Sequence, residues 1–266
     1  MTQALTISQL EKESRANMHY SGVVDIPFSE FRNRVLAHDN EIYQELFDGK
    51  VFILRSTHSE EQMVKLKKII HEFGQSTPEC FYKIQGDCPN FHVTNQDNPL
   101  YKVLMSIHSY HFFSWNDSPI NIFGDVSEAL EVYETLCEYD PREILRNTCD
   151  DDVVARIQIH HYPTGGGHTQ MHIDPTTFVK VAWITMMTKR GVDYENGGLY
   201  VLDISGNKFY PELSLDLNIG DTVVLYPQMI HGVDAIDAGH TSEWASDNGR
   251  WALIFNNLPV ARAPGN

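Results

Sequence analysis

Three side chains, those of His172, Asp174 and His231, constrain this chain more than any other feature of its sequence. The triplet His172-Ile173-Asp174 follows a turn-rich segment. His231 follows the run 221–226, which has strand character and ends at Pro227. Two imidazoles and one carboxylate can occupy one face of an octahedral metal ion and leave three positions open. The chain is therefore expected to fold so that strands far apart in sequence bring these three residues together.

A His-X-Asp triplet is weak evidence alone, because a chain with 13 His is expected to contain one by chance. Its surroundings are more informative. Residues 162–167 form a turn-rich break after the alternating run 156–160. Arg250 opens a further run with strand character, residues 250–255. Each candidate ligand thus lies at the mouth of an expected strand, where a rigid scaffold can aim it.

Five short motifs then occur in a fixed order between about Val153 and Asn257. They are His172-Ile173-Asp174, Gly197-Gly198-Leu199-Tyr200, Gly220-Asp221, His231 and Arg250. This order resembles the double-stranded β-helix (jelly-roll) core of the Fe(II)/2-oxoglutarate-dependent oxygenases. The resemblance implies that His172, Asp174 and His231 bind Fe(II), with 2-oxoglutarate and O₂ as co-substrates. Succinate, CO₂ and an oxidised substrate would be the products.

The distal carboxylate of 2-oxoglutarate needs a cation, and the forked guanidinium of arginine suits it. Arg250 occupies the family's position for this residue. However, the gap after His231 is longer than usual, and Ala252 stands where relatives often have Ser or Thr. Tyr162 lies where many relatives place a hydroxyl group, and we expect it to assist. Arg156 is a rival cation, either for the co-substrate or for an anionic substrate.

Strand alternation assigns faces to these residues, because successive side chains of a strand point to opposite sides. Arg156, Gln158, His160 and Tyr162 share one face of their expected strand. On the last strand, Arg250, Ala252, Ile254 and Asn256 lie opposite Trp251, Leu253 and Phe255. We expect the first face of each strand to point toward the metal and the apolar face to pack under helices. Gln158 is then a candidate substrate contact.

Residues 108–116 are dense in aromatics without helical spacing. We interpret them as a lid or substrate wall that includes Tyr110 and Trp115. The competing interpretation is ordinary aromatic core packing. Trp183, on the expected strand after the triplet, is a further candidate for the substrate wall.

The N-terminal half favours helices and the C-terminal half favours strands. Helices are expected at 6–17, 29–48, 59–73 and 127–139, and a short strand at 51–54. We therefore predict one α+β oxygenase domain over 1–266. Residues 1–150 would form a mainly helical extension that buttresses one sheet, and residues 151–260 the cupin-like jelly-roll core.

Composition narrows the class of protein. Hydrophobic residues make up 42% of the chain, which suffices for a core. No apolar run approaches the roughly 18 residues of a membrane span, and no signal peptide is recognisable, so we expect a soluble cytoplasmic protein. Cys80, Cys88, Cys137 and Cys149 show no paired spacing and are interpreted as reduced thiols.

The formal net charge of −16 argues against a nucleic-acid substrate, which would require clustered Lys and Arg. We predict a dioxygenase that hydroxylates a small molecule such as a free amino acid or natural-product intermediate. Asp174 fills the position that Gly or Ala occupies in halogenating relatives, so hydroxylation is favoured. The alternatives are a cupin-type oxygenase that does not use 2-oxoglutarate, and a catalytically silent metal-binding sensor. A cupin has no need of Arg250, and a sensor would bind iron without forming succinate. The sequence carries no signal for oligomeric state.

Overall fold

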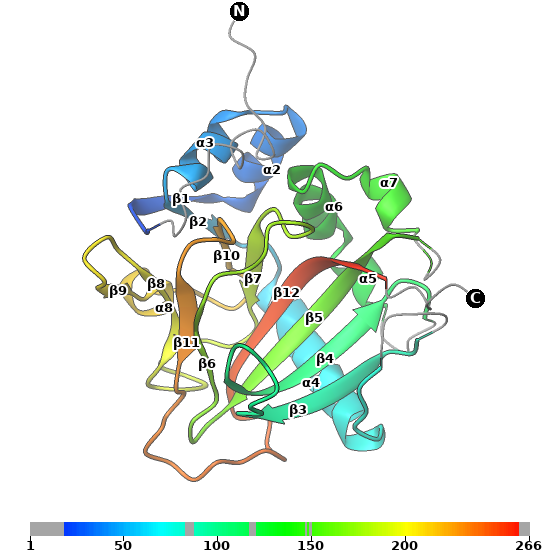
Figure 1. The fold of residues 1–266 in the computed structure, drawn as a ribbon, viewed down its shortest axis with the longest axis vertical. Coiled ribbons are helices and arrows are strands. Elements are labelled where there is room, and N and C mark those ends of the chain that lie inside the picture. The colour runs from blue at the N-terminus through cyan, green and yellow to red at the C-terminus, as the bar shows by residue number, and fades with distance from the viewer. Residues whose placement is uncertain (1–18, 83–87, 117–120, 147, 149–150, 261–266) are drawn as a thin grey trace, which may run out of the picture.

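A single strongly curled sheet organises the protein (Figure 1). The structure, a computed structural model, describes residues 19–82, 88–116, 121–146, 148 and 151–260. Twelve strands pair in the order β1-β2-β10-β7-β12-β5-β4-β6-β11-β8-β9, and β3 pairs with β4. The strands are β1 (Gly22–Pro27), β2 (Lys50–Arg55), β3 (Phe91–Gln96), β4 (Met105–Phe113), β5 (Val153–Pro163), β6 (His168–His172), β7 (Ala182–Met186), β8 (Gly198–Leu202), β9 (Lys208–Phe209), β10 (Thr222–Leu225), β11 (His231–Asp234) and β12 (Gly249–Pro259).

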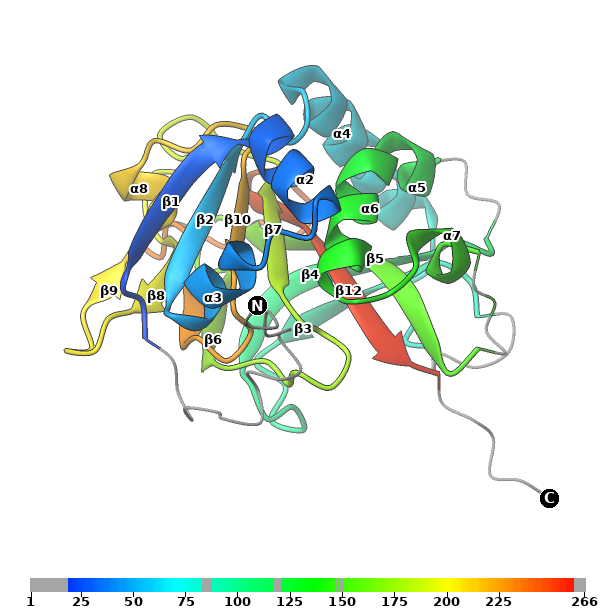
Figure 2. The same ribbon diagram turned by 90° about the horizontal axis from the view of Figure 1, so that it is seen from above.

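The helices lie mainly on the outer face of this sheet. They are α2 (Phe28–Leu36), α3 (Glu41–Phe47), α4 (Glu60–Ser76), α5 (Ile122–Asp125), α6 (Ser127–Leu136), α7 (Pro141–Ile144) and α8 (Pro211–Ser214). Figure 2 shows α2, α4 and α6 over the same side of the sheet, and their buried residues share one apolar core with those of β5 and β12. The expected α+β jelly-roll architecture is confirmed.

Strand β12 shows how alternation separates the two faces of the sheet. Trp251, Leu253 and Phe255 belong to the core beneath the helices. Ala252 packs in a second core on the inner side of the sheet, together with Ile184 of β7. The expected division of β12 into an outward apolar face and an inward face is therefore confirmed.

The N-terminal half contributes more sheet than its sequence indicates. Strand β2 matches the expected strand at 51–54, but β1, β3 and β4 also join the sheet. Most of β4 is buried on both faces, so it lacks the alternation of polar and apolar residues that reveals a strand. The prediction of a lid at 108–116 is wrong, because residues up to Phe113 form β4, between β3 and β5.

Two helix boundaries also differ from expectation. Ser59 caps α4 by accepting a hydrogen bond from the Gln62 N–H at 3.2 Å, but the helix continues past Gly74. A Cβ at Gly74 would come within 2.8 Å of the Tyr110 ring, so this glycine permits close packing rather than ending the helix. The single helix expected at 29–48 is instead α2 and α3, separated at His38, whose φ is 55°. The helix expected at 6–17 lies outside the described residues.

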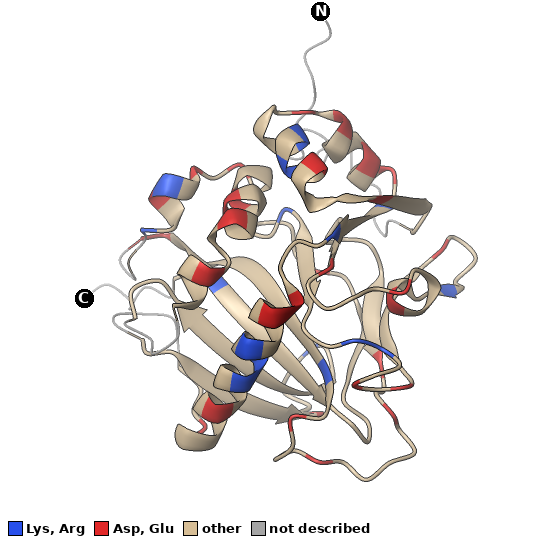
Figure 3. Ribbon diagram, turned by 180° about the vertical axis from the view of Figure 1, so that it is seen from behind, with Lys and Arg blue, Asp and Glu red and all other residues tan. Residues whose placement is uncertain are grey.

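In Figure 3, acidic and basic residues are both spread over several helices and loops. Helix α4 carries Lys65, Lys67 and Lys68 between acidic residues at its two ends. No disulfide joins the described cysteines Cys80, Cys88 and Cys137, and Cys149 is not among the described residues. Across the described ranges, no helix is both long and apolar enough to cross a bilayer.

Candidate metal centre and its cavity

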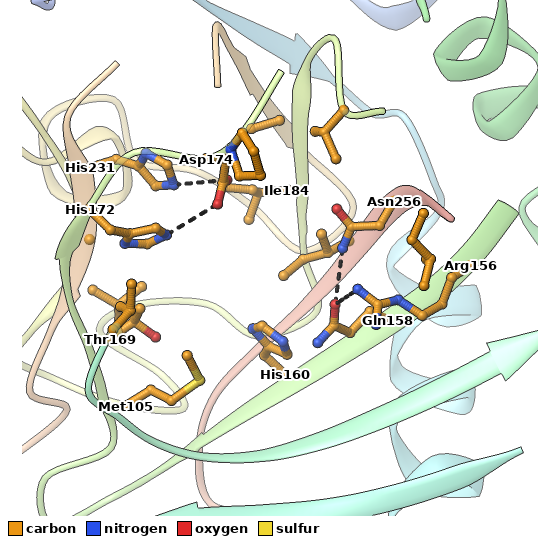
Figure 4. A pocket seen from close by; sticks show the side chains of 18 of the residues that line it. Met105, Arg156, Gln158, His160, Thr169, His172, Asp174, Ile184, His231 and Asn256 are labelled. Atoms are coloured by element: carbon orange, nitrogen blue, oxygen red, sulfur yellow. Dashed lines mark hydrogen bonds and ion pairs between the residues drawn. The ribbon is translucent and has the colours of Figure 1, made fainter. Parts of the chain in front are cut away.

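Strands β6 and β11 place two histidines directly opposite each other. His172 is the last residue of β6, His231 is the first of β11, and the two are paired in the antiparallel register. Asp174 follows β6 in a loop held by its backbone N–H, which donates to the Pro227 carbonyl at 2.9 Å. The Nε2 atoms of His172 and His231 lie 3.6 and 3.5 Å from the Asp174 carboxylate oxygens (Figure 4).

The donor set fits a divalent metal ion. One ligand atom from each of the three residues lies within 4.8 Å of the others. The Nδ1–H of His172 can donate to the Gln170 carbonyl, and that of His231 to the Met229 carbonyl, each at 2.8 Å. These bonds fix the ring tautomer and leave both Nε2 lone pairs for a metal. Two imidazoles and a carboxylate form the facial set that Fe(II) accepts.

The electrostatics of His172 and Asp174 agree with this chemistry. Burial, followed by the proximity of His231, lowers the pKa of His172. Burial would raise the pKa of Asp174, but hydrogen bonding to His231 and the two nearby imidazoles hold it below its ordinary value. Burial would lower the pKa of His231, yet the Asp174 carboxylate raises it. Asp174 is therefore ionised at neutral pH, as a metal ligand must be.

The three residues open onto a cavity of about 580 Å³ between the two walls of the sheet. Much of its lining is apolar and includes Val103, Met105, Phe178, Val179, Ile184, Leu199, Ile254 and Leu258. Among the described residues in the wall, Arg156, Asp174 and Arg250 are the charged ones. This volume lies within the range of small-molecule sites.

Arg250 is in the cavity wall, and Glu212 already neutralises its charge. The Arg250 side chain is 1% exposed, and its Nε and Nη2 atoms lie 2.7 and 2.6 Å from Oε1 of Glu212. The other Glu212 oxygen accepts a hydrogen bond from the Leu199 N–H at 2.9 Å. A Cβ at Gly198 would overlap that oxygen, so only glycine permits this approach.

Tyr162 lies beside Arg250, because β5 and β12 pair these two residues. The Arg250 guanidinium carbon is 5.2 Å from the centre of the Tyr162 ring. The hydroxyl of Tyr162 lies 3.3 Å from Oγ1 of Thr169 and 3.3 Å from Nδ1 of His160. Burial, followed by the charge of Arg156, lowers the pKa of His160 to about 3, so this ring is neutral. A cluster of hydroxyl groups therefore adjoins the Arg250 ion pair.

A second polar group lies farther along β5. Gln158 accepts hydrogen bonds from Nη2 of Arg156 at 2.8 Å and from Nδ2 of Asn256 at 2.9 Å. Figure 4 shows this group across the cavity from the three candidate ligands, with His160 between them in that view. The expectation that Arg156, Gln158, His160 and Tyr162 share one face is confirmed, since all four line the cavity.

Three residues predicted to touch substrate lie elsewhere. Tyr110 is 1% exposed and stacks on Trp251 with ring centres 5.6 Å apart, and Trp183 belongs to the same outer core. Trp115 packs against Phe113, and its indole N–H donates to the Cys88 carbonyl at 3.0 Å. None of the three is in the cavity wall, so these predictions are wrong. Both faces of β7 are buried, which hides the direction in which Trp183 points.

Three residues of this site were not predicted from the sequence. They are Glu212, which pairs with Arg250, Thr169, which contacts the Tyr162 hydroxyl, and Asn256, which donates to Gln158. Asn256 carried a signal, because it shares a face of β12 with Arg250. Glu212 carried none, because it lies in the short helix α8 and reaches Arg250 only through the fold.

Solved structures share this fold at low sequence identity. A full-length Neurospora crassa protein in complex with alpha-KG aligns with a TM-score of 0.52 and 11% identity, covering 89% of this chain and 84% of that chain. A Caulobacter crescentus protein described as of the 2OG-Fe(II) oxygenase family aligns with a TM-score of 0.50 and 12% identity, covering 88% and 86%. No family model matches the chain, and no curated protein matches it in sequence. The similarity establishes the fold.

Proposed function

We propose that this protein is an Fe(II)- and 2-oxoglutarate-dependent dioxygenase that hydroxylates a small molecule. The observation that carries the proposal is the cluster of His172, Asp174 and His231, whose ligand atoms lie within 4.8 Å of one another in the wall of the cavity. The same fold occurs in the Neurospora crassa protein whose structure contains alpha-KG. The cavity volume of about 580 Å³ supports a small substrate.

In this proposal each residue has a defined task. His172 and His231 bind Fe(II) through Nε2, and Asp174 binds it through its carboxylate. Bound Fe(II) supplies the oxidative chemistry, in which substrate, O₂ and 2-oxoglutarate give hydroxylated substrate, succinate and CO₂. Arg250 and the Tyr162 hydroxyl bind the distal carboxylate of 2-oxoglutarate. The apolar wall keeps bulk water away from the reacting groups.

Asp174 supports hydroxylation rather than halogenation. Its carboxylate lies within 3.6 Å of both imidazole Nε2 atoms, which is the position of a third protein ligand. A halide would need that position to be vacant.

One observation favours a second candidate, a cupin-type oxygenase that does not use 2-oxoglutarate. The ion pair between Arg250 and Glu212 gives this arginine a structural role even without a co-substrate. A co-substrate carboxylate would have to bind the guanidinium N–H groups that Glu212 leaves available.

Succinate formation separates these candidates. In a screen of small-molecule metabolites with Fe(II), ascorbate, O₂ and 2-oxoglutarate, the purified protein should release succinate with its substrate, and His172→Ala, Asp174→Ala and His231→Ala should each abolish this without unfolding. Circular dichroism and metal analysis supply the controls. Retained turnover in any of these variants would refute the assignment of the ligands. Substrate oxidation that needs Fe(II) and O₂ but no 2-oxoglutarate would instead establish the second candidate.

A further inference from the structure

The two arginines in the cavity wall differ in how their charge is balanced. Arg250 has a carboxylate partner at 2.6 Å. Within the part of the chain that the structure describes, no carboxylate forms an ion pair with Arg156. Its hydrogen-bond partners are the Gln158 amide oxygen at 2.8 Å and Nδ1 of His111 at 3.3 Å. Burial, followed by the charge of Arg156, keeps the pKa of His111 well below its ordinary value, so both partners are neutral.

The donors of Arg156 are only partly used. A guanidinium carries five N–H groups, and the two hydrogen bonds account for one on each Nη atom. Nε is buried and has no partner among the described residues. The remaining donors can bind an anion in the two-point manner that arginine favours. Gln158 is itself held by the Asn256 amide and, through its Nε2 at 2.9 Å, by the Ser109 hydroxyl.

An arginine inside a largely apolar cavity is destabilising unless an anion joins it. 2-Oxoglutarate cannot serve both arginines, because one of its carboxylate ends is needed at the metal and its five-carbon chain is short. Arg156 and Tyr162 are six residues apart on β5, which corresponds to roughly 20 Å of strand. Arg250 is paired with Tyr162, so the two cations occupy separate ends of the cavity. Arg156 therefore lacks a counter-ion even when the co-substrate is bound.

We infer that Arg156, oriented by Gln158 and Asn256, binds a carboxylate of the substrate, whose apolar body lies between this carboxylate and the metal. This inference rests on the proposed function and specifies its substrate class. The rest of the cavity lining is mainly apolar and includes Phe178, Val179, Ile184 and Ile254. Asp174 is the one carboxylate among the described residues of the wall, and it faces the two histidines. Apart from Asp174, the described residues of the wall thus offer no acidic partner for an ammonium group, which favours an apolar carboxylic acid over a free amino acid.

The test compares acids with their neutral amides. Probes are straight-chain carboxylates from butanoate to decanoate, 3-phenylpropanoate and 4-phenylbutanoate, each with its primary amide. Binding is measured by calorimetry on the Fe(II)-loaded protein with saturating 2-oxoglutarate and without O₂. We expect the best acid to bind the wild type about 10- to 100-fold more tightly than its amide, as a charged two-point contact implies. Arg156→Gln should abolish this preference, and Arg156→Lys should keep part of it.

The affinity for 2-oxoglutarate, measured separately, provides the discriminating control. Arg156→Gln should leave it unchanged. If Arg156→Gln loses 2-oxoglutarate affinity, Arg156 serves the co-substrate and the inference is overturned. It is equally overturned if the wild type shows no preference for any acid over its amide. Failure of 2-oxoglutarate to bind the wild type at all would instead refute the proposed function. Arg142→Gln, which removes an exposed arginine, is the matched control and should behave as wild type.

A second measurement separates binding from a structural role. Removing a structural arginine lowers the melting temperature, whereas removing a buried cation without a counter-ion should leave it unchanged or raise it. We therefore expect ligand-free Arg156→Gln to melt no lower than wild type. A marked drop in its melting temperature, with no change in acid preference in the folded protein, would show that Arg156 is structural.

Discussion

The role of the ion pair between Arg250 and Glu212 can be tested by two independent measurements, the melting temperature and the affinity for 2-oxoglutarate. Both side chains are at least 95% buried, since Arg250 is 1% and Glu212 5% exposed. Removing one member of a buried pair leaves an uncompensated charge and costs about 3–5 kcal/mol. For a chain of this size, each kcal/mol lowers the melting temperature by roughly 2–4 °C. Arg250→Gln and Glu212→Gln should therefore each melt roughly 6–20 °C below wild type.

Co-substrate affinity should distinguish the two variants. In the proposed function, Arg250 contacts the distal carboxylate of 2-oxoglutarate and Glu212 does not. Loss of a desolvated charge partner typically costs about 2–5 kcal/mol of binding energy. A loss of about 2 kcal/mol corresponds to a dissociation constant that is roughly 30-fold larger. Arg250→Gln should therefore bind 2-oxoglutarate at least that much more weakly than the wild type. Glu212→Gln keeps the guanidinium, releases it from a competing carboxylate, and should bind 2-oxoglutarate at least as tightly as wild type.

Calorimetric titration of 2-oxoglutarate into the Fe(II)-loaded proteins without O₂, at a temperature where both variants are folded, provides the measurement. The double variant Arg250→Gln/Glu212→Gln has both charges removed. It should melt at a higher temperature than either single variant but should bind 2-oxoglutarate no better than Arg250→Gln. Wild-type affinity in Arg250→Gln would refute the assignment of this arginine to the co-substrate. Equal losses of affinity in both single variants would show that the pair acts only by shaping the wall.

Two further variants test the site and the core. In the proposed function Asp174 fills one ligand position of the metal, so Asp174→Gly should lose hydroxylation and leave that position open. Mass spectrometry in chloride-containing buffer should find no chlorinated product from the wild type. In the core, burial raises the pKa of Glu134 to about 8, against the effect of a hydrogen bond from Asn257. The Glu134 carboxyl therefore holds its proton more tightly in the folded state than in the unfolded chain. The free energy of unfolding falls as pH rises from about 4.5 to 8. Between pH 5 and pH 8.5 this fall amounts to up to about 4 kcal/mol in the wild type. Glu134→Gln should lack it in urea unfolding at these two pH values, and parallel pH profiles of the two proteins would contradict the prediction.

The candidate metal ligands could be predicted from the sequence because their signal is local. Ligand chemistry limits the residue types, and strand ends limit their positions, so His172 and His231 could be assigned without knowing which strands pair. The alternation of β5 likewise identified the residues that line the cavity, since its polar and apolar positions differ clearly.

The missed features depend on non-local packing. Strands β4 and β7 are almost fully buried on both faces, so nothing in their sequence shows that Tyr110 and Trp183 point away from the cavity. Glu212 meets Arg250 because α8 and the Gly198 backbone converge on it. Such a contact between distant segments leaves no periodic signal in the chain.

The direct pairing of His172 with His231 also bears on how the protein assembles. The side chains of a strand alternate, so a slip of one residue between β6 and β11 would turn one imidazole away from the other. Only the correct register offers both rings to one ion. If the site binds a metal as proposed, binding therefore favours the correct pairing of these two short strands. Free metal at about 100 times its dissociation constant would stabilise that pairing by about 2.7 kcal/mol. Amide hydrogen exchange in β6 and β11 should accordingly slow on metal loading more than exchange in β5 and β12, whose pairing extends over 11 residues each.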